Sequence, residues 1–223
     1  MKKTLDFLKK VKKNNNREWF NENKAAYLQS EEELKSFVHQ VAAKMSAHDV
    51  IDPDGTKIYR IYRDVRFSND KTPYKKHRAA HFKRFGADRR GGYYLHIEPG
   101  NNFIAGGFWR PSSDDLLLMR KHIEQDAEPL RDILNQKGLK NYFGEMVGDK
   151  VKTAPKGFSR DHPAIDLLQY KGYILTHEFT DDEVVDPHFA QEVSDGFRNM
   201  RPFLDYMTEI VTTDLNGVPL AEK

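Results

Sequence analysis

The sequence contains no cysteine, which excludes disulfide bonds, thiolate metal sites and thiol nucleophiles. It also has no apolar run close to the ~20 residues that span a bilayer. The basic residues 1–13 alternate with apolar ones and do not form the continuous apolar core of a signal peptide. We therefore expect a soluble, cytoplasmic protein without membrane attachment.

Several sequence motifs of enzymes are absent as well. The nine histidines are dispersed, and none belongs to an H-E-x-x-H pattern, so no metal site is predicted. Neither a G-K-[ST] phosphate loop nor a G-x-S-x-G elbow is present. The sequence thus predicts no cofactor, and it argues against the hydrolases built on that elbow.

The composition is that of a folded protein with a substantial core. Hydrophobic residues make up 38% and aromatic residues 12% of the 223 positions, and the 31% of charged residues are of mixed sign. Without an internal repeat or a clear linker, a single α+β domain over residues 1–223 is expected. Within it we assign N-terminal helices to 1–50, a sheet and a basic loop to 57–109, helices and one further strand to 112–213, and a loose tail to 214–223.

Alternation of apolar and polar residues predicts a mainly antiparallel sheet of about five strands with flanking helices. The predicted strands lie near 58–65, 78–85, 92–98, 102–109 and 171–179. Apolar residues at helical spacing predict helices over about 4–12 and from Asn16 to Met45, the first turn of the latter being capped by Asn15 and Glu18. A long C-terminal helix begins at Asp186-Pro187 and bends or breaks at Pro202.

One segment of the chain is strongly basic. Between Lys57 and Arg90, twelve lysines and arginines face three aspartates, which gives this basic segment a net charge of +9. Because the whole chain carries only +2, everything outside the segment sums to −7. Such a local excess of positive charge indicates contact with an anion.

The candidate ligand-binding residues lie in this basic segment. They are Arg60, Arg63, Arg66, Lys71, Tyr74 and Lys75. Alternation along the predicted strand 58–65 places Arg60 on one face and Arg63 on the other. The planar guanidinium of arginine suits a carboxylate or a phosphate. The alternative is structural: a partly buried arginine forms an internal salt bridge with Asp64, Glu98 or Glu178.

The catalytic candidates are His96, Glu98 and His77. Tyr94, His96 and Glu98 alternate along one face of the predicted strand 92–98. A histidine titrates near neutral pH, and a carboxylate can orient it for acid–base chemistry. The same row is equally typical of the solvated face of a sheet.

Five motifs resemble a known family in the same order along the chain. They are N-N-x-R-E-W-F-x-x-N-K, R-I-Y-R-D-x-R-F-S-x-D-K-x-P-Y-K-x-H, G-Y-Y-L-H-I-E-P-G, P-K-G-F and D-H-P-A-I-D-L-L. The chain resembles, from Leu5 to about Met207, a widespread microbial family catalogued as domain of unknown function 2461. This resemblance implies no activity, cofactor or catalytic residue.

Three classes of function are compatible with the sequence. The first is a protein, either an enzyme or a binding protein, that takes a small phosphorylated or carboxylated ligand at the basic segment. The second is a nucleic-acid-binding protein, in which the same cations contact phosphates. The third is a structural or interaction domain without catalytic activity, whose basic segment pairs with acids of the same chain.

Overall fold

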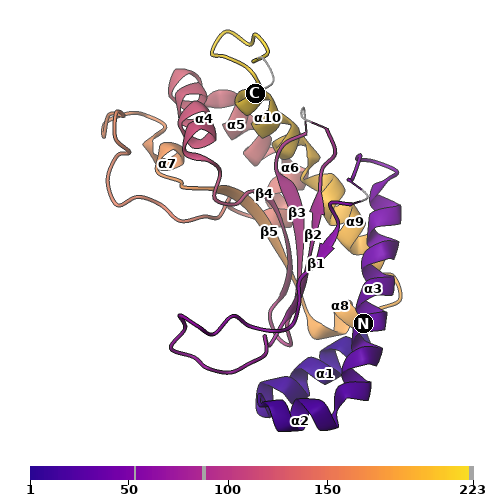
Figure 1. The fold of residues 1–223 in the computed structure, drawn as a ribbon. Coiled ribbons are helices and arrows are strands. Elements are labelled where there is room, and N and C mark those ends of the chain that lie inside the picture. The colour runs from indigo at the N-terminus through magenta and orange to yellow at the C-terminus, as the bar shows by residue number, and fades with distance from the viewer. Residues whose placement is uncertain (53, 87–88, 221–223) are drawn as a thin grey trace. The chain divides into compact units, whose positions relative to one another are not determined.

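The structure is a computed structural model that describes residues 1–52, 54–86 and 89–220. It contains one five-stranded antiparallel sheet whose strands follow the order β1-β2-β3-β4-β5 (Figure 1). The strands are β1 (Lys57–Ile58), β2 (Arg78–Lys83), β3 (Gly92–Ile97), β4 (Asn102–Phe108) and β5 (Tyr173–Phe179). The predicted α+β class and the mainly antiparallel sheet are confirmed.

Helices contribute most of the remaining regular structure. Their bounds are α1 (Lys2–Lys13), α2 (Arg17–Glu22), α3 (Lys24–Met45), α4 (Ser113–Gln125), α5 (Glu128–Asn135), α6 (Lys137–Phe143), α7 (Ile165–Leu168), α8 (Asp181–Val185), α9 (Phe189–Asn199) and α10 (Arg201–Thr212). Of the predicted tail, residues 214–220 are described, with a bridge between Thr213 and Pro219, while 221–223 lie outside the described residues. Within the described part of the chain, no helix is long and apolar enough to cross a membrane.

The chain folds into two compact units, each made of three separate segments. The first unit comprises residues 1–82, 94–104 and 178–195, and the second comprises 83–93, 105–177 and 196–223. Strands β2 to β5 therefore contribute residues to both units. The single domain expected from the sequence stays a prediction.

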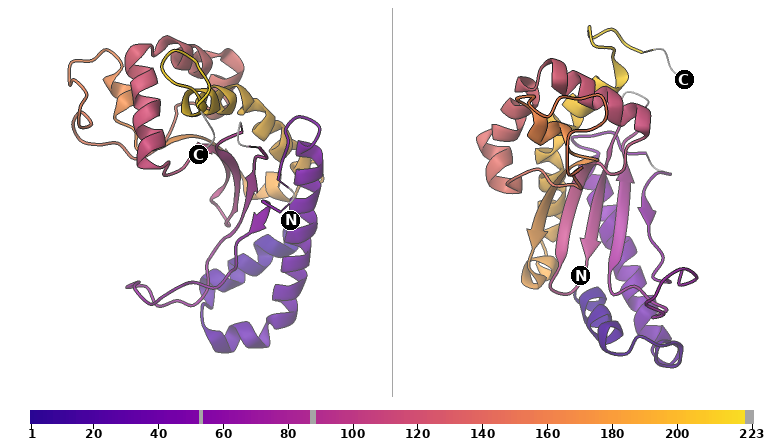
Figure 2. Two further views of the ribbon diagram at one scale, coloured as in Figure 1. Left: turned by 45° about the horizontal axis from the view of Figure 1, so that its top comes forward. Right: turned by 90° about the vertical axis from the view of Figure 1, so that its left-hand side faces the viewer.

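In the first unit, helices α1 and α3 lie side by side (Figure 2). Their buried apolar residues include Leu8 and Val11 of α1 and Leu34 and Val38 of α3. The Thr4 hydroxyl, buried at this contact, donates to Glu33 Oε2 at 2.8 Å. Removal of these side chains from water stabilises the helix pair, because apolar burial contributes about 25 cal/mol per Å².

In the second unit, glycines let other elements approach the sheet closely. Gly106 leaves room for the Met200 sulfur, and Gly107, with a φ of +137°, lies against the Tyr173 carbonyl. Nearby, the ring of Tyr93 packs 4.9 Å from that of Phe197. These two glycines thus mark a place where the α9–α10 junction and the neighbouring strand approach β4 closely.

One strand and one helix differ clearly from the predictions. The strand expected at 58–65 is only Lys57–Ile58 in the structure. Its pairing with β2 is interrupted after Ile58, because the two sides of the hairpin contain different numbers of residues before the next bridge between Tyr62 and Tyr74. The helix expected from Asn16 to Met45 breaks at Asn23. Its first turn is capped by the Asn16 side chain and not by Asn15, because Asn16 accepts from Trp19 N at 2.9 Å.

The long C-terminal helix is instead a pair of helices. Helix α9 ends at Asn199 and α10 begins at Arg201, with Pro202 in the first turn of α10. Proline has no amide hydrogen and clashes with the carbonyl four residues earlier, so it fits only near the start of a helix. The break predicted at Pro202 is therefore present, two residues upstream of the proline.

Candidate functional site on the sheet of the first unit

The site is positioned by an irregular hairpin between β1 and β2. Ile58 pairs with Ala80, and a second bridge joins Tyr62 to Tyr74. Three residues separate Ile58 from Tyr62, whereas five separate Tyr74 from Ala80. The two extra residues interrupt the ladder between Lys75 and Ala79, and such bulges turn side chains out of the regular alternation.

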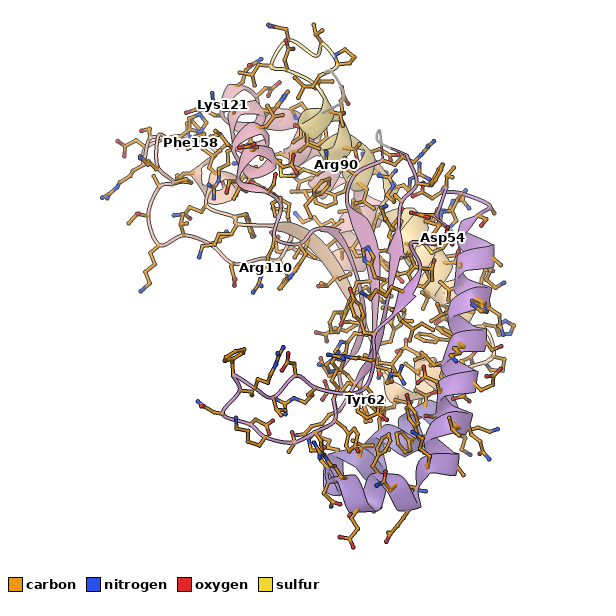
Figure 3. The ribbon with its side chains drawn as sticks, viewed as in Figure 1. Asp54, Tyr62, Arg90, Arg110, Lys121 and Phe158 are labelled. Atoms are coloured by element: carbon orange, nitrogen blue, oxygen red, sulfur yellow. The ribbon has the colours of Figure 1, made fainter. Side chains whose placement is uncertain are left out.

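The long loop at the end of this hairpin is held together by its own side chains. It extends beyond Tyr62, away from the strands of the first unit (Figure 3). Arg63 donates to Asp70 Oδ2 at 2.6 Å and also bonds the Thr72 hydroxyl. These contacts make the loop an ordered structure, as the turn-forming residues between 66 and 77 predict.

Two further cations of the loop are also engaged within it. Arg66 forms an ion pair with Asp64 at 2.7 Å, and Lys71 donates to the Val65 carbonyl at 3.0 Å. Hydrogen bonds from Arg66 lower the pKa of the exposed Asp64 carboxyl. Internal pairing therefore exists, as the structural alternative expects, although Arg63 pairs with Asp70 and not with Asp64, Glu98 or Glu178.

Tyr74 is a core residue in this structure. Its side chain is 4% exposed, and its ring stacks on Phe20 at 3.9 Å with an interplanar angle of 12°. Asn15 fixes the backbone of Tyr74 from both sides, accepting from its amide at 3.0 Å and donating to its carbonyl at 2.9 Å. The ring is thus used for packing and not offered to a ligand.

Arg60 and Lys75 have a different environment from the loop cations. In the described residues of the first unit, neither charged group has a hydrogen bond or an ion pair to an acid. The Lys75 ammonium lies 5.7 Å from the ring centre of Tyr59. Burial, together with the charges of Arg60 and Arg78, lowers the pKa of Lys75.

His77, His96 and Glu98 converge beside these cations. Each offers one ligating atom, and the three atoms lie within 4.8 Å of one another. His96 Nε2 is 3.3 Å from Glu98 Oε2, and the rings of His77 and His96 are 4.4 Å apart. The alternation along β3 correctly placed His96 and Glu98 on one face, which we call the open face of the sheet in the first unit.

Aromatic rings fix the orientation of His96. Its Nδ1 is 3.0 Å from the Tyr94 hydroxyl, and its ring stacks on Phe103 at 4.6 Å with an angle of 12°. Tyr94 is in turn 6.3 Å from Tyr59, so the rings form a continuous surface. Phe103 was not singled out in the sequence, although its position in the strand after the Pro99–Asn101 turn places it opposite this row.

The electrostatics of the three groups follow from burial, which is nearly complete for His96, at 7% exposed, and partial for His77 and Glu98. Burial lowers the pKa of His77 to about 4, assisted by His96 and Lys75. Burial likewise lowers the pKa of His96 despite its bond to Glu98. Burial acts to raise the pKa of Glu98, but hydrogen bonds from Asn101 and His96 outweigh it and lower that pKa.

The hollow described on the surface of the first unit lies elsewhere. Its volume is about 560 Å³, and it is lined by α1, α3 and the segment around α8, including Glu33, Gln40 and Pro187. None of the candidate residues lines it. This hollow is therefore separate from the candidate site.

Residues 3–206 match the family model described as "Conserved hypothetical protein (DUF2461)". The chain belongs to this family. Neither the curated proteins nor the solved structures include a match to it. Membership in DUF2461 confirms the resemblance of the sequence motifs to this family.

Proposed function

We propose that this DUF2461 protein binds a small phosphorylated or carboxylated ligand on the open face of its first unit, next to Arg60 and Lys75. The observation that supports this most directly is the pair of cations itself. Within the described residues neither group forms a hydrogen bond or an ion pair with an acid, although the charge of Arg60 lowers the pKa of Asp64, whereas Arg63 and Arg66 of the same motif are each bonded to an aspartate. A guanidinium and an ammonium together complement an anion of one or two charges.

The surroundings of the two cations favour a small ligand. Lys75 is half-buried against Tyr59, so part of its hydration is already lost before a ligand binds. Tyr94, His96 and Phe103 continue the apolar and polar surface beside it. Aromatic walls with a few placed polar groups are typical of sites for small molecules.

Titration of the protein with phosphate, sulfate, citrate and nucleotides, followed by thermal unfolding, tests the proposal. A ligand that binds only the folded state at a hundredfold excess over its Kd stabilises it by about 2.7 kcal/mol. Arg60→Ala and Lys75→Met should each remove that stabilisation. Arg66→Ala is the matched control, because Arg66 is 76% exposed and bonds an aspartate two residues away.

Two results would contradict the proposal. One is that all of these anions leave the unfolding temperature of the wild type unchanged. The other is that Arg66→Ala or Lys71→Ala abolishes the stabilisation while Arg60→Ala and Lys75→Met retain it, which would locate the ligand on the loop.

A second candidate function is that of an interaction domain, with the loop beyond Tyr62 as its contact surface. The supporting observation is Phe67, whose side chain is 96% exposed at the end of a loop that is internally bonded. We infer that the exposed ring packs against a partner, because burial of its apolar surface on association is favourable. Phe67→Ser should then impair association with that partner without changing the unfolding temperature.

A further inference from the structure

Two histidines and one carboxylate meet on the open face although they are far apart in the sequence. His77 directly precedes β2, His96 lies in β3, and Glu98 follows the end of β3. Because β2 and β3 are neighbours in the sheet, the three donor atoms come within 4.8 Å of one another. Since the sequence lacks any compact metal-binding motif, only the strand pairing reveals this cluster.

We propose that His77, His96 and Glu98 form a binding site for one divalent transition-metal ion. Two imidazoles and one carboxylate are the donor set that suits Zn²⁺, Fe²⁺, Co²⁺ or Ni²⁺, whereas Mg²⁺ and Ca²⁺ prefer oxygen ligands alone. Three protein ligands leave coordination positions for water or for a bound molecule.

The distances require only small side-chain movements. Two ligands that are each about 2.1 Å from one ion lie about 3.0–3.4 Å apart at angles between octahedral and tetrahedral. His96 Nε2 and Glu98 Oε2 already satisfy this at 3.3 Å. His77, which is partly exposed, supplies the third atom within the 4.8 Å limit and can close the remaining gap by rotation.

Neighbouring groups hold the proposed ligands in place. With Nε2 of His96 directed at the ion, its Nδ1 carries the proton and donates to the Tyr94 hydroxyl 3.0 Å away. Asn101 Nδ2 donates to Glu98 Oε2 at 3.3 Å, and Asn102 Oδ1 accepts from the Glu98 amide at 3.0 Å. Such outer contacts orient metal ligands and commonly change metal affinity 10–100-fold when lost.

The position of the cluster also suggests how the metal would serve the site. Lys75 lies two residues before His77, and its ammonium is 5.7 Å from the ring of Tyr59, which in turn is 6.3 Å from the ring of Tyr94 beside His96. An anion held by Arg60 and Lys75 could therefore occupy an open position on the ion. This second step rests on the proposed function, whereas the binding of the metal itself does not.

The test uses the full-length protein after removal of metals with EDTA and dialysis. Calorimetric titration with ZnCl₂ should show one ion per chain, and Co²⁺ should give the visible absorption bands of a coordinated ion. His77→Ala and Glu98→Gln should each weaken zinc binding at least 100-fold, and Tyr94→Phe should weaken it 10–100-fold. His39→Ala, which removes an exposed histidine of α3, is the control and should bind zinc as the wild type does.

The inference is overturned if the folded wild type binds no zinc, or if His77→Ala and Glu98→Gln retain its affinity. Glu98 is partly exposed, so Glu98→Gln should keep the fold even if a histidine variant does not. Titration with phosphate in the presence of EDTA separates this inference from the proposed function. Phosphate binding without zinc binding overturns only the metal site, and zinc binding without phosphate binding overturns only the anion site.

Discussion

Arg78 and Glu31 form a buried ion pair that joins strand β2 to helix α3. The Arg78 side chain is 3% exposed, and its guanidinium bonds both carboxylate oxygens of Glu31, with one contact of 3.2 Å. It also donates to the Tyr59 carbonyl at 3.1 Å. Arg78 belongs to the basic segment, but its charge is neutralised by Glu31 within the first unit.

Removal of the acid from this pair should destabilise the protein strongly. Glu31→Gln leaves the Arg78 charge buried and uncompensated, which typically costs about 3–5 kcal/mol. For a chain of this size, that corresponds to a decrease in Tm of about 6–20 °C. Thermal unfolding measures it, with Glu32→Gln on the exposed face of α3 as the control. An equal Tm for Glu31→Gln and Glu32→Gln would refute the structural role of the pair.

The same pair should make stability depend on pH. Burial acts to raise the pKa of Glu31, but the hydrogen bond and charge of Arg78 outweigh it, so the pKa is lowered. A group whose folded pKa lies below its unfolded value binds more protons when unfolded, so its contribution is complete above the unfolded pKa. This contribution to the free energy of unfolding is then lost as the pH falls below the unfolded pKa of 4.5 and through the lower folded pKa of Glu31.

Denaturant unfolding at a series of pH values between 7 and 3 tests this dependence. The difference in unfolding free energy between the wild type and Glu31→Gln should be constant above pH 5. It should then shrink as the pH falls, because the protonated Glu31 resembles glutamine. A difference that grows toward low pH would have the wrong sign for a lowered pKa.

Gly107 should tolerate no side chain. Its φ of +137° is unfavourable for other residues, and an added Cβ would meet the Tyr173 carbonyl, which belongs to the neighbouring strand backbone and cannot move alone. Gly107→Ala should therefore cost more than the about 1–3 kcal/mol of an unusual backbone conformation. Gly100→Ala separates the two effects, because Gly100 has a φ of +80° with no atom near its added Cβ. Equal losses of Tm would show that the close approach at Gly107 is unimportant.

The sequence predicted the sheet apart from the length of its first strand and the order of its strands, but it did not predict how the site residues come together. The row Tyr94, His96, Glu98 follows from period-two alternation, which is a local property of one strand. That His77 meets this row depends on which strand pairs with β3 and on the two extra residues in the β1–β2 hairpin. Neither leaves a signal within a short sequence window, because register is decided by contacts distant in the chain.

The role of Tyr74 shows the same limit. Its position among lysines suggests a ligand contact, yet the ring fills a cluster with Phe20 and Phe7 of the N-terminal helices. Tyr74→Phe should therefore leave both Tm and anion binding nearly unchanged, whereas Tyr74→Ala should destabilise by about 3–5 kcal/mol. Thermal unfolding with and without phosphate distinguishes these outcomes. Loss of phosphate binding in Tyr74→Phe at an unchanged Tm would show that the Tyr74 hydroxyl does contact the ligand.

Nucleic acid should bind weakly, because much of the basic segment is neutralised by acids of the same chain. The pairs are Arg63–Asp70, Arg66–Asp64, Arg78–Glu31, Arg84–Asp205 and Arg90–Asp115. A protein that contacts six or more phosphates loses roughly a thousandfold or more in affinity between 50 and 200 mM salt. At least five of the twelve cations of the basic segment are paired in this way, and the rest of the chain carries a net charge of −7, so we expect no binding with that salt dependence.

Fluorescence anisotropy with short duplexes and single strands at 50, 100 and 200 mM salt provides the measurement. We expect no binding at micromolar protein at any of these concentrations. Micromolar binding with a steep salt dependence would contradict the assignment of a small anionic ligand. Lys75→Met and Arg66→Ala would then locate the contact: loss in the first variant alone implicates the open face, while loss in the second alone implicates the loop, where the Arg66–Asp64 pair would have to open to reach a phosphate.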